Sequence, residues 1–169
     1  MPPRSKKTTQ RDRLMSRTRP SDTYHLPVGD EAEMRDATAA VETAQEALSV
    51  ARMRFDDRAA VAVEEAQAAL AQAGKALAAL YEPVVIRAMK PAAFEQLVAE
   101  HPAREGKEER WNADTFPRAL FLESVVGELT REEWESLLDE GCSEGEKTGM
   151  LLTAQLVNAR TPDGTIPKG

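Results

Sequence analysis

The residues best suited to catalysis or metal binding are few and scattered along this chain. The two histidines, His25 and His101, each lie close to a proline. Neither has a second histidine, a cysteine or an acidic residue at the spacing of a metal-ligand motif. Cys142, the single cysteine, has no histidine at an informative interval and cannot form a disulfide within the chain. These residue types and spacings predict neither a metal site nor a nucleophilic catalyst.

Phosphate-binding and acid/base motifs are also incomplete. The segment GCSEGEKTG, residues 141–149, contains a Lys-Thr pair but lacks the Gly-x-x-x-x-Gly-Lys-Ser/Thr spacing of a phosphate-binding loop. The acidic segment REEWESLLDE, residues 131–140, could supply paired carboxylates, but acids on the helices of an acidic protein mostly form solvated faces. We therefore expect a protein that is not an enzyme and has no cofactor and no small-molecule substrate.

The charge of the chain is divided unevenly. The formal net charge is −7, yet residues 1–19 contain seven Lys and Arg residues against Asp12 alone, which leaves −13 on residues 20–169. An acidic body repels nucleic acid and anionic membranes, and the basic segment has no aromatic residue to stack on bases. Residues 1–29 are rich in Ser, Thr and Pro and poor in apolar residues, so we expect a disordered basic tail. Neither a membrane-spanning stretch nor a signal peptide is evident, which favours a cytoplasmic location.

Residues 30–82 have the composition of a long amphipathic helix. Apolar residues alternate three and four positions apart, with a register shift near Asp56 and Asp57. A continuous rod would absorb the shift as a stutter, whereas a hairpin would turn at RFDDRA. The absence of Gly and Pro from that segment favours the rod. In either form the narrow stripe needs a partner surface, from self-association or a protein ligand. Its candidate contact residues are Met34, Val41, Leu48, Phe55, Val63, Leu70 and Leu77.

Residues 83–160 are predicted to form a small domain of four helices. Pro83 ends the long helix, and VVIRAM, residues 84–89, is either an extended connection, such as a lone edge strand, or the first turn of the next helix; its β-branched residues favour the former. Thr130 and Glu133 have the spacing of a capping box, as do Ser143 and Glu146. The expected fold class is thus mainly all-α, a coiled-coil-like helix or helical hairpin followed by a four-helix domain. Residues 161–169 are expected to be a flexible C-terminus.

Both tryptophans and two of the four phenylalanines lie close together in the sequence. They are Trp111, Phe116, Phe121 and Trp134. Aromatic residues also anchor protein interfaces, but within predicted helices they more often form a core. Trp111 lies just outside the first of these helices and is the member most free to contact a partner.

The C-terminal half of the chain resembles a known family. The successive segments VVIRAMKPAAFEQLVAEHP, WNADTFPRALF, LTREEWESLLDE and LLTAQLVNAR resemble tail assembly chaperones and related small tail-gene products of long-tailed phages, especially those infecting actinobacteria. The resemblance covers roughly residues 30–160, and WNADTFPRALF is its most specific segment. It has no binding motif that would assign roles to single residues.

The resemblance implies a non-enzymatic protein that coats the tape measure protein and keeps it soluble while the tail tube assembles. The implied partners are the tape measure protein and the tail tube protein, together with further copies of this chain. The implied location is the host cytoplasm, and the protein would be absent from the mature virion. Two alternatives stay open: a structural or scaffold subunit that assembles through the coiled-coil helix, and a nucleic-acid-binding adaptor that uses the basic tail.

Overall fold

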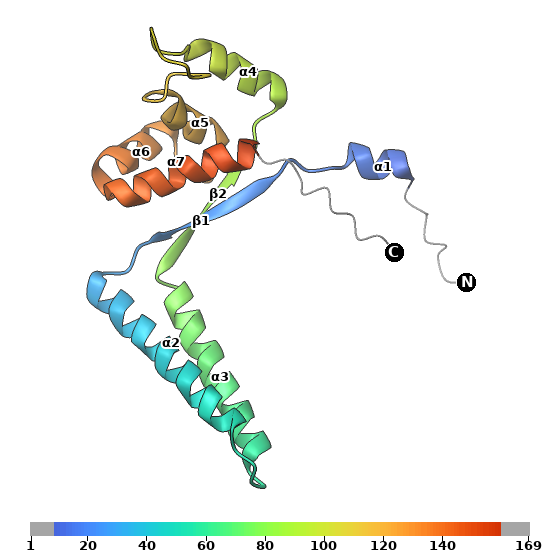
Figure 1. Cartoon of the computed structure of the whole chain (residues 1–169), viewed down its shortest axis with the longest axis vertical. Coiled ribbons are helices and arrows are strands. Elements are labelled where there is room, and N and C mark those ends of the chain that lie inside the picture. The colour runs from blue at the N-terminus through green and yellow to red at the C-terminus, as the bar shows by residue number, and fades with distance from the viewer. Residues whose placement is uncertain (1–8, 160–169) are drawn as a thin grey trace. The chain divides into compact units, whose positions relative to one another are not determined.

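The computed structural model describes residues 9–159, which form helices and a small β-sheet (Figure 1). The chain divides into two compact units. One comprises residues 25–84 and is called the hairpin unit here. The other, the core unit, comprises residues 1–24 and 85–169, of which 9–24 and 85–159 are described. The division falls within strands β1 (Ser21–Pro27) and β2 (Tyr81–Arg87).

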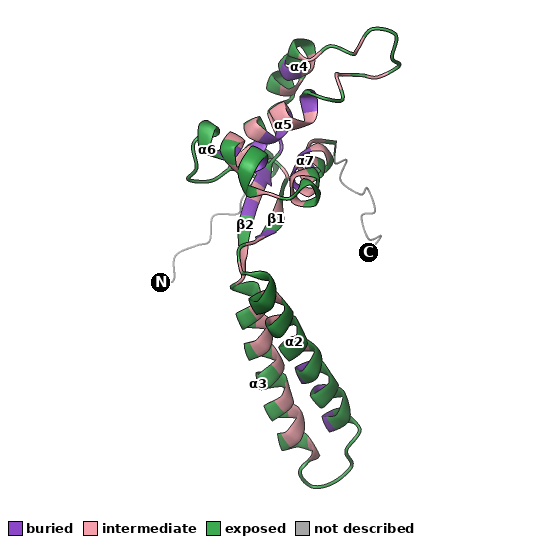
Figure 2. Ribbon diagram, turned by 90° about the vertical axis from the view of Figure 1, so that its left-hand side faces the viewer, coloured by how far each residue is buried: buried purple, intermediate pink, exposed green. Residues whose placement is uncertain are grey.

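Two long helices, α2 (Glu31–Arg52) and α3 (Ala59–Ala78), form the hairpin. They lie side by side along their length (Figure 2). Helix α2 begins at a capping box, in which the Asp30 carboxylate accepts from the Glu33 N–H at 2.8 Å and Glu33 accepts from the Asp30 N–H at 3.1 Å. The continuous rod favoured by the sequence is therefore wrong, and the register shift marks a turn.

Asp56 explains how a turn forms without Gly or Pro. Its carboxylate accepts from the Arg54 guanidinium at 2.7 Å and from the Arg58 N–H at 3.1 Å. Its carbonyl oxygen accepts from the N–H of Ala59, the first residue of α3, at 2.9 Å. Aspartate side chains that bond to the backbone two residues on are a standard turn device. The turn signal was thus present in RFDDRA, in its aspartate.

A three-stranded sheet corrects the predicted fold class. Its strand order is β1-β2-β3, where β3 is the two-residue strand Val125–Val126. Strands β2 and β3 are antiparallel, with Val85 opposite Val126 and Ile86 opposite Val125. The protein is therefore mixed α and β, whereas the sequence predicted a mainly all-α fold with at most one short extended segment. That extended segment, VVIRAM, does lie largely in β2.

The range predicted to be a disordered tail contains ordered elements. Helix α1 (Gln10–Met15) has a capping box at Thr9, and β1 follows it. The Ala88 N–H donates to the Pro20 carbonyl at 2.8 Å, and the Arg19 guanidinium donates to the Ala88 carbonyl at 2.7 Å. The prediction of disorder is wrong for this part of 1–29. Residues 1–8, and the C-terminus 161–169 predicted to be flexible, lie outside the described residues.

The core unit packs its helices around large apolar side chains. The helices are α4 (Pro91–Glu100), α5 (Phe116–Ser124), α6 (Arg131–Ser136) with a π-helical continuation over Leu137–Gly141, and α7 (Glu144–Ala159). The large apolar side chains that are fully buried are Ile86, Phe116, Leu120, Phe121, Leu138 and Met150. Figure 2 shows this burial in α5, α7 and β2. Helices form where the sequence predicted them in this region, and Phe116, Phe121 and Trp134 are buried, but the helices share the unit with β2 and β3, so the predicted four-helix domain is wrong.

Asn158 connects α7 to the segment that follows β2. Its side-chain oxygen accepts from the Met89 N–H at 2.8 Å. Its amide nitrogen donates to the hydroxyl of Ser124, a buried residue, at 3.1 Å and to the Ala154 carbonyl at 2.8 Å. One side chain thus satisfies polar groups of α5, α7 and the chain after β2, which would otherwise be costly to bury.

Candidate protein-binding site

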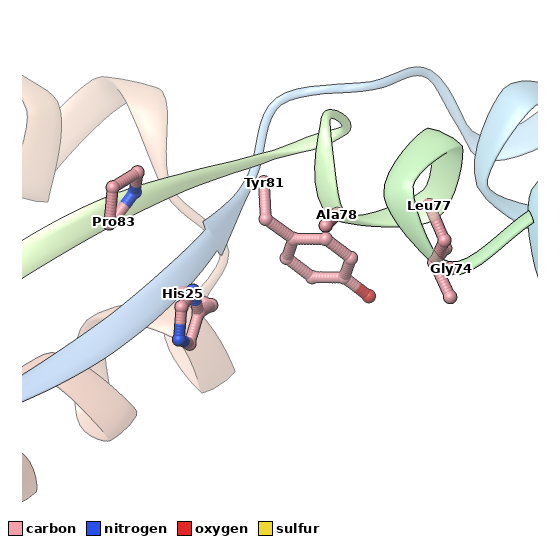
Figure 3. Close-up of a pocket in the computed structure, with 6 residues that line it drawn as sticks. All are labelled: His25, Gly74, Leu77, Ala78, Tyr81 and Pro83. Atoms are coloured by element: carbon pink, nitrogen blue, oxygen red, sulfur yellow. The ribbon is translucent and has the colours of Figure 1, made fainter. Parts of the chain in front are cut away.

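An open apolar groove lies at the base of the hairpin, where α3 ends and β2 begins. Its volume is about 460 Å³, and its walls are mainly apolar. The lining residues are His25, Gly74, Leu77, Ala78, Tyr81 and Pro83. Figure 3 shows the Tyr81 ring in the middle of the groove, with His25 and Pro83 to one side and Gly74 and Leu77 to the other. An open, mainly apolar groove suits the apolar face of a protein partner better than a small polar substrate.

Gly74 lies inside helix α3 without a packing reason. A Cβ atom added to it would meet no other atom within 4 Å. Glycine inside a helix costs roughly 0.5–1 kcal/mol relative to alanine. Neither a positive φ nor a close neighbour explains this cost. What glycine does provide here is depth, because any side chain at this position would extend into the groove.

Leu77 is the predicted contact residue that lines the groove, and the other predicted stripe residues take different positions. Leu48 is buried, and Met34, Val41, Val63 and Leu70 are half-buried. Their spacing in the sequence is that of the helix faces through which α2 and α3 pack against each other. The stripe therefore covers itself within one chain to a large extent. Helix α3 nevertheless has no buried residue, so the cover is shallow.

Phe55 stands apart from the rest of the stripe. It lies in the turn between α2 and α3, and 99 % of its surface is exposed. Val50, Met53 and Val61 beside it in sequence are also exposed. We call these four residues the tip patch. It is a concentrated group of exposed large apolar side chains, and such groups mark interaction sites.

Trp111 belongs to the core unit and is half-buried. Its ring stacks on Phe116 at 4.4 Å between centroids and meets Phe94 edge-on at 6.2 Å. The Arg110 guanidinium lies 5.5 Å from the Trp111 ring centroid, within the range of a cation–π contact. Trp111 thus belongs to the core unit, whereas the groove residues all belong to the hairpin unit.

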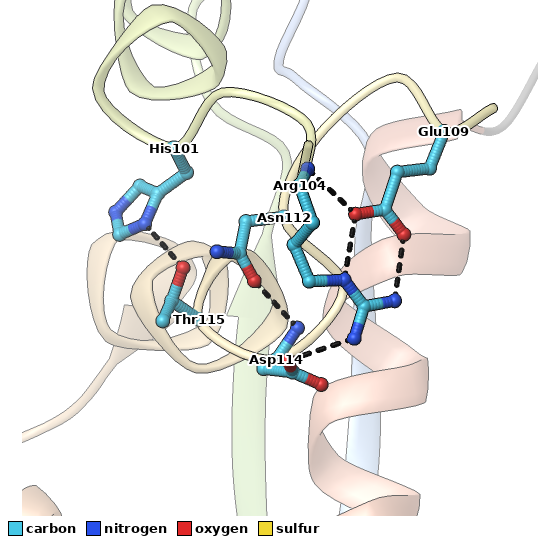
Figure 4. Close-up of polar contacts among 6 residues, drawn as sticks. All are labelled: His101, Arg104, Glu109, Asn112, Asp114 and Thr115. Atoms are coloured by element: carbon cyan, nitrogen blue, oxygen red, sulfur yellow. Dashed lines mark hydrogen bonds and ion pairs between the residues drawn. The ribbon is translucent and has the colours of Figure 1, made fainter. Parts of the chain in front are cut away.

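Ion pairs of Arg104 connect residues of the loop that contains Trp111. The Arg104 side chain donates to both carboxylate oxygens of Glu109 at 2.8 Å and to Asp114 at 2.8 Å (Figure 4). The Arg104 hydrogen bonds lower the pKa of Glu109 to about 2. Nearby, the Asn112 side chain accepts from the Asp114 N–H at 3.0 Å. Arg104 thus pairs with both Glu109 and Asp114 within this loop.

The remaining candidates for chemistry occupy separate places. His25 lines the groove, while His101 Nδ1 lies 2.9 Å from the Thr115 hydroxyl in the loop (Figure 4). Burial raises the pKa of the Cys142 thiol, and the Glu146 carboxylate raises it further, so the thiolate is disfavoured. Within residues 9–159, no three His, Cys, Asp or Glu side chains are grouped so as to hold a metal ion.

Most of the groove residues were missed by sequence reasoning. The groove joins His25 of β1 to Tyr81 and Pro83 of β2, because the two strands are neighbours in the sheet. His25 is far from the other two residues in the sequence, so no local pattern connects them. Gly74 did carry a readable signal, since it is the one glycine between Glu31 and Glu82.

Comparison with known protein families, with curated proteins and with solved structures found no match. In the described range, 9–159, the helices lack the combination of length and apolarity that crossing a membrane requires.

Proposed function

We propose that this protein is a non-enzymatic assembly chaperone that binds an amphipathic helix through the groove at the base of the hairpin. The partner we propose is the tape measure protein of a long-tailed phage, kept soluble in the host cytoplasm until the tail tube encloses it. The groove carries the proposal, and the resemblance of residues 30–160 to tail assembly chaperones supplies the partner's identity.

The chemistry of the groove fits a helix that must be bound reversibly. Leu77, Ala78 and Pro83 provide apolar contacts, while Tyr81 adds a ring with a polar tip. A tape measure protein is expected to be a long helix with apolar residues exposed before the tube forms. An open groove covers part of that surface, and release needs no opening of the chaperone fold.

Co-expression tests this function. The tape measure protein encoded near this gene is expressed alone, with the wild-type chain, and with a Gly74→Leu variant. We expect the wild-type chain to move the tape measure protein into the soluble fraction. The Gly74→Leu variant should fail to do so, because its side chain occupies the groove without meeting any atom of the fold at Cβ.

Gly145→Leu is the matched control. Gly145 also lies in a helix, α7, and an added Cβ there also meets nothing within 4 Å. This variant should solubilise the tape measure protein like the wild type. Equal solubility of the tape measure protein with and without the wild-type chain would refute the proposal.

The composition of purified virions tests the proposed location. A chaperone that leaves when the tube closes should be absent from particles by mass spectrometry. Recovery in stoichiometric amounts would instead identify a structural subunit.

A further inference from the structure

The tip patch projects an apolar side chain, and the groove is an apolar hollow that could receive one. Phe55 projects from the hairpin turn with 99 % of its surface exposed, whereas the other phenylalanines, Phe94, Phe116 and Phe121, are buried or half-buried. The groove of about 460 Å³ exceeds the roughly 150 Å³ of a cavity that binds benzene in another protein. A phenylalanine ring therefore fits into it with room for a neighbouring apolar side chain such as Met53.

The groove of the same chain is out of reach of Phe55. The turn lies at the start of α3, and Leu77 lies near its end. From Ala59 to Leu77 the helix rises by about 27 Å at 1.5 Å per residue. A Phe55 side chain that enters the groove must therefore come from a different copy of the chain.

The charges at the two ends of the hairpin are also complementary. Residues 50–61 contain three arginines and two aspartates, a net charge of +1, in a chain of net charge −7. Residues 28–36 and 74–82, at the base, contain five acidic residues against Arg35 and Lys75, a net charge of −3. Opposite charges around an apolar contact favour encounter and fix its orientation.

We propose that the tip patch of one copy docks in the groove of a second copy, with Phe55 as the inserted side chain. The two surfaces differ, so the contact is head-to-tail, and every open assembly keeps one free tip at one end and one free groove at the other. The number of copies in each assembly should therefore increase with protein concentration, and association should not stop at a closed dimer. The inference rests on the groove and not on the identity of its helical ligand. A bound helix and a second copy would compete for the same residues.

Sedimentation velocity of the purified full chain over a concentration series tests this inference. We expect the mean mass of the wild type to rise with concentration. Phe55→Ser should weaken association about tenfold to a hundredfold, as expected for the loss of one buried aromatic side chain. Gly74→Leu should weaken it to a similar extent, because the leucine side chain occupies the groove. Leu152→Ser is the matched control, because it removes an exposed apolar side chain of α7 and should leave association unchanged.

Cross-linking identifies the contact directly. Met53→Cys, which keeps Phe55, and Ala78→Cys, which keeps Gly74, are prepared separately, each with Cys142→Ser, and then mixed under oxidising conditions. A disulfide that joins the two variants, and forms faster than either variant joins to itself, supports the contact. Preferential self-joining of either variant contradicts it.

Three further outcomes would overturn the inference. These are a wild type that stays monomeric at all concentrations, a Phe55→Ser variant that associates like the wild type, and weakening by Phe55→Ser without weakening by Gly74→Leu. Because these measurements contain no tape measure protein, they fail independently of the chaperone proposal. If Phe55→Ser abolishes tape measure solubilisation while the wild type is monomeric, the tip binds the tape measure protein instead, which also overturns self-association.

Discussion

The core unit and the hairpin unit are both rich in helix, but they bury different side chains. The large side chains with less than 2 % exposure, including Phe116, Phe121 and Met150, all belong to the core unit. The hairpin unit buries Leu26, Ala44, Leu48, Ala51 and Val84, each less completely. Ion pairs follow the same division, since those between described residues lie in the core unit except for Arg54 with Asp56.

This difference indicates a division of labour. Stabilisation by burial scales with the apolar area removed from water, so the alanine-rich hairpin gains less from its own packing. Segments with few buried contacts open locally at low free energy, and binding elements are often drawn from them. The groove and the tip patch both lie in the hairpin unit. The core unit supplies stability, and the hairpin is the unit we expect to exchange partners.

Removing Phe121 should have the largest effect on folding. Its side chain is fully buried and meets Trp134 edge-on at 5.6 Å. Phe121→Ala should lower the free energy of unfolding by about 3–5 kcal/mol. Urea unfolding followed by tryptophan fluorescence measures this loss. A cost below about 1 kcal/mol would show that the core unit is not packed as described.

Leu48→Ala tests whether the hairpin is the weaker unit. Leu48 is buried between alanine-rich helices, so the expected cost is about 2–3 kcal/mol, at the lower end for such substitutions. Far-UV circular dichroism should report a lower hairpin stability. Tryptophan fluorescence should change little, because Trp111 and Trp134 both belong to the core unit. Parallel loss of both signals would contradict the proposed division.

Gly149→Ala should destabilise the docking of β1 on α7. An added Cβ would lie 2.6 Å from Cε2 and 3.0 Å from the hydroxyl oxygen of Tyr24. The end of the half-buried Tyr24 side chain must shift to make room, so we expect a cost of about 1 kcal/mol, the lower end for overpacking. Gly145→Ala in the same helix is the control and should be neutral or stabilising, because its Cβ meets nothing. Thermal unfolding compares the two variants, and equal melting temperatures would refute the Tyr24 contact.

Gly74→Ala should stabilise the hairpin by about 0.5–1 kcal/mol, since alanine is the better helix former and its Cβ is unobstructed. The same substitution should weaken partner binding, because it makes the groove shallower. Circular dichroism measures the stability, and co-precipitation with the proposed partner, the tape measure protein, measures the binding. Loss of stability would show that glycine serves the fold here and not the groove.

Acidification should slightly destabilise the loop that contains Trp111. Arg104 lowers the pKa of Glu109 from 4.5 to about 2, so the stabilisation is present above about pH 4.5 and is lost as the pH falls toward 2. NMR titration of the Glu109 carboxyl group should give this low pKa. In an Arg104→Gln variant the pKa should return toward 4.5. An unchanged pKa in the variant would show that Arg104 is not its cause.

Local signals in the sequence predicted the helices of the core unit well. Both expected capping boxes form, with the Thr130 N–H donating to Glu133 at 2.7 Å and the Ser143 N–H donating to Glu146 at 2.7 Å. Such motifs depend on residues three positions apart, so a single sequence contains all the information that they need.

The sheet and the groove depend on residues that are distant in sequence. Strand β1 has Pro27 and several polar residues, and it becomes a strand because β2, more than fifty residues later, lies beside it. Val125 and Val126 follow α5 directly, yet they pair with Ile86 and Val85 of β2 instead of continuing the helix. Strand propensity is set largely by such cross-strand contacts, which no local pattern reveals. Leu77 could therefore be singled out in advance, whereas its neighbours His25 and Tyr81 could not.

The hairpin leaves and re-enters the sheet at adjacent points. The Val28 and Gly29 N–H groups both donate to the Leu80 carbonyl, at 2.8 and 3.2 Å, which closes the base of the hairpin. Lengthening α2 and α3 by seven residues each would carry the turn about 10 Å further while leaving both strands in register. The hairpin is thus an arm of adjustable length. Insertions and deletions of whole heptads in related chains would change its span without changing its attachment.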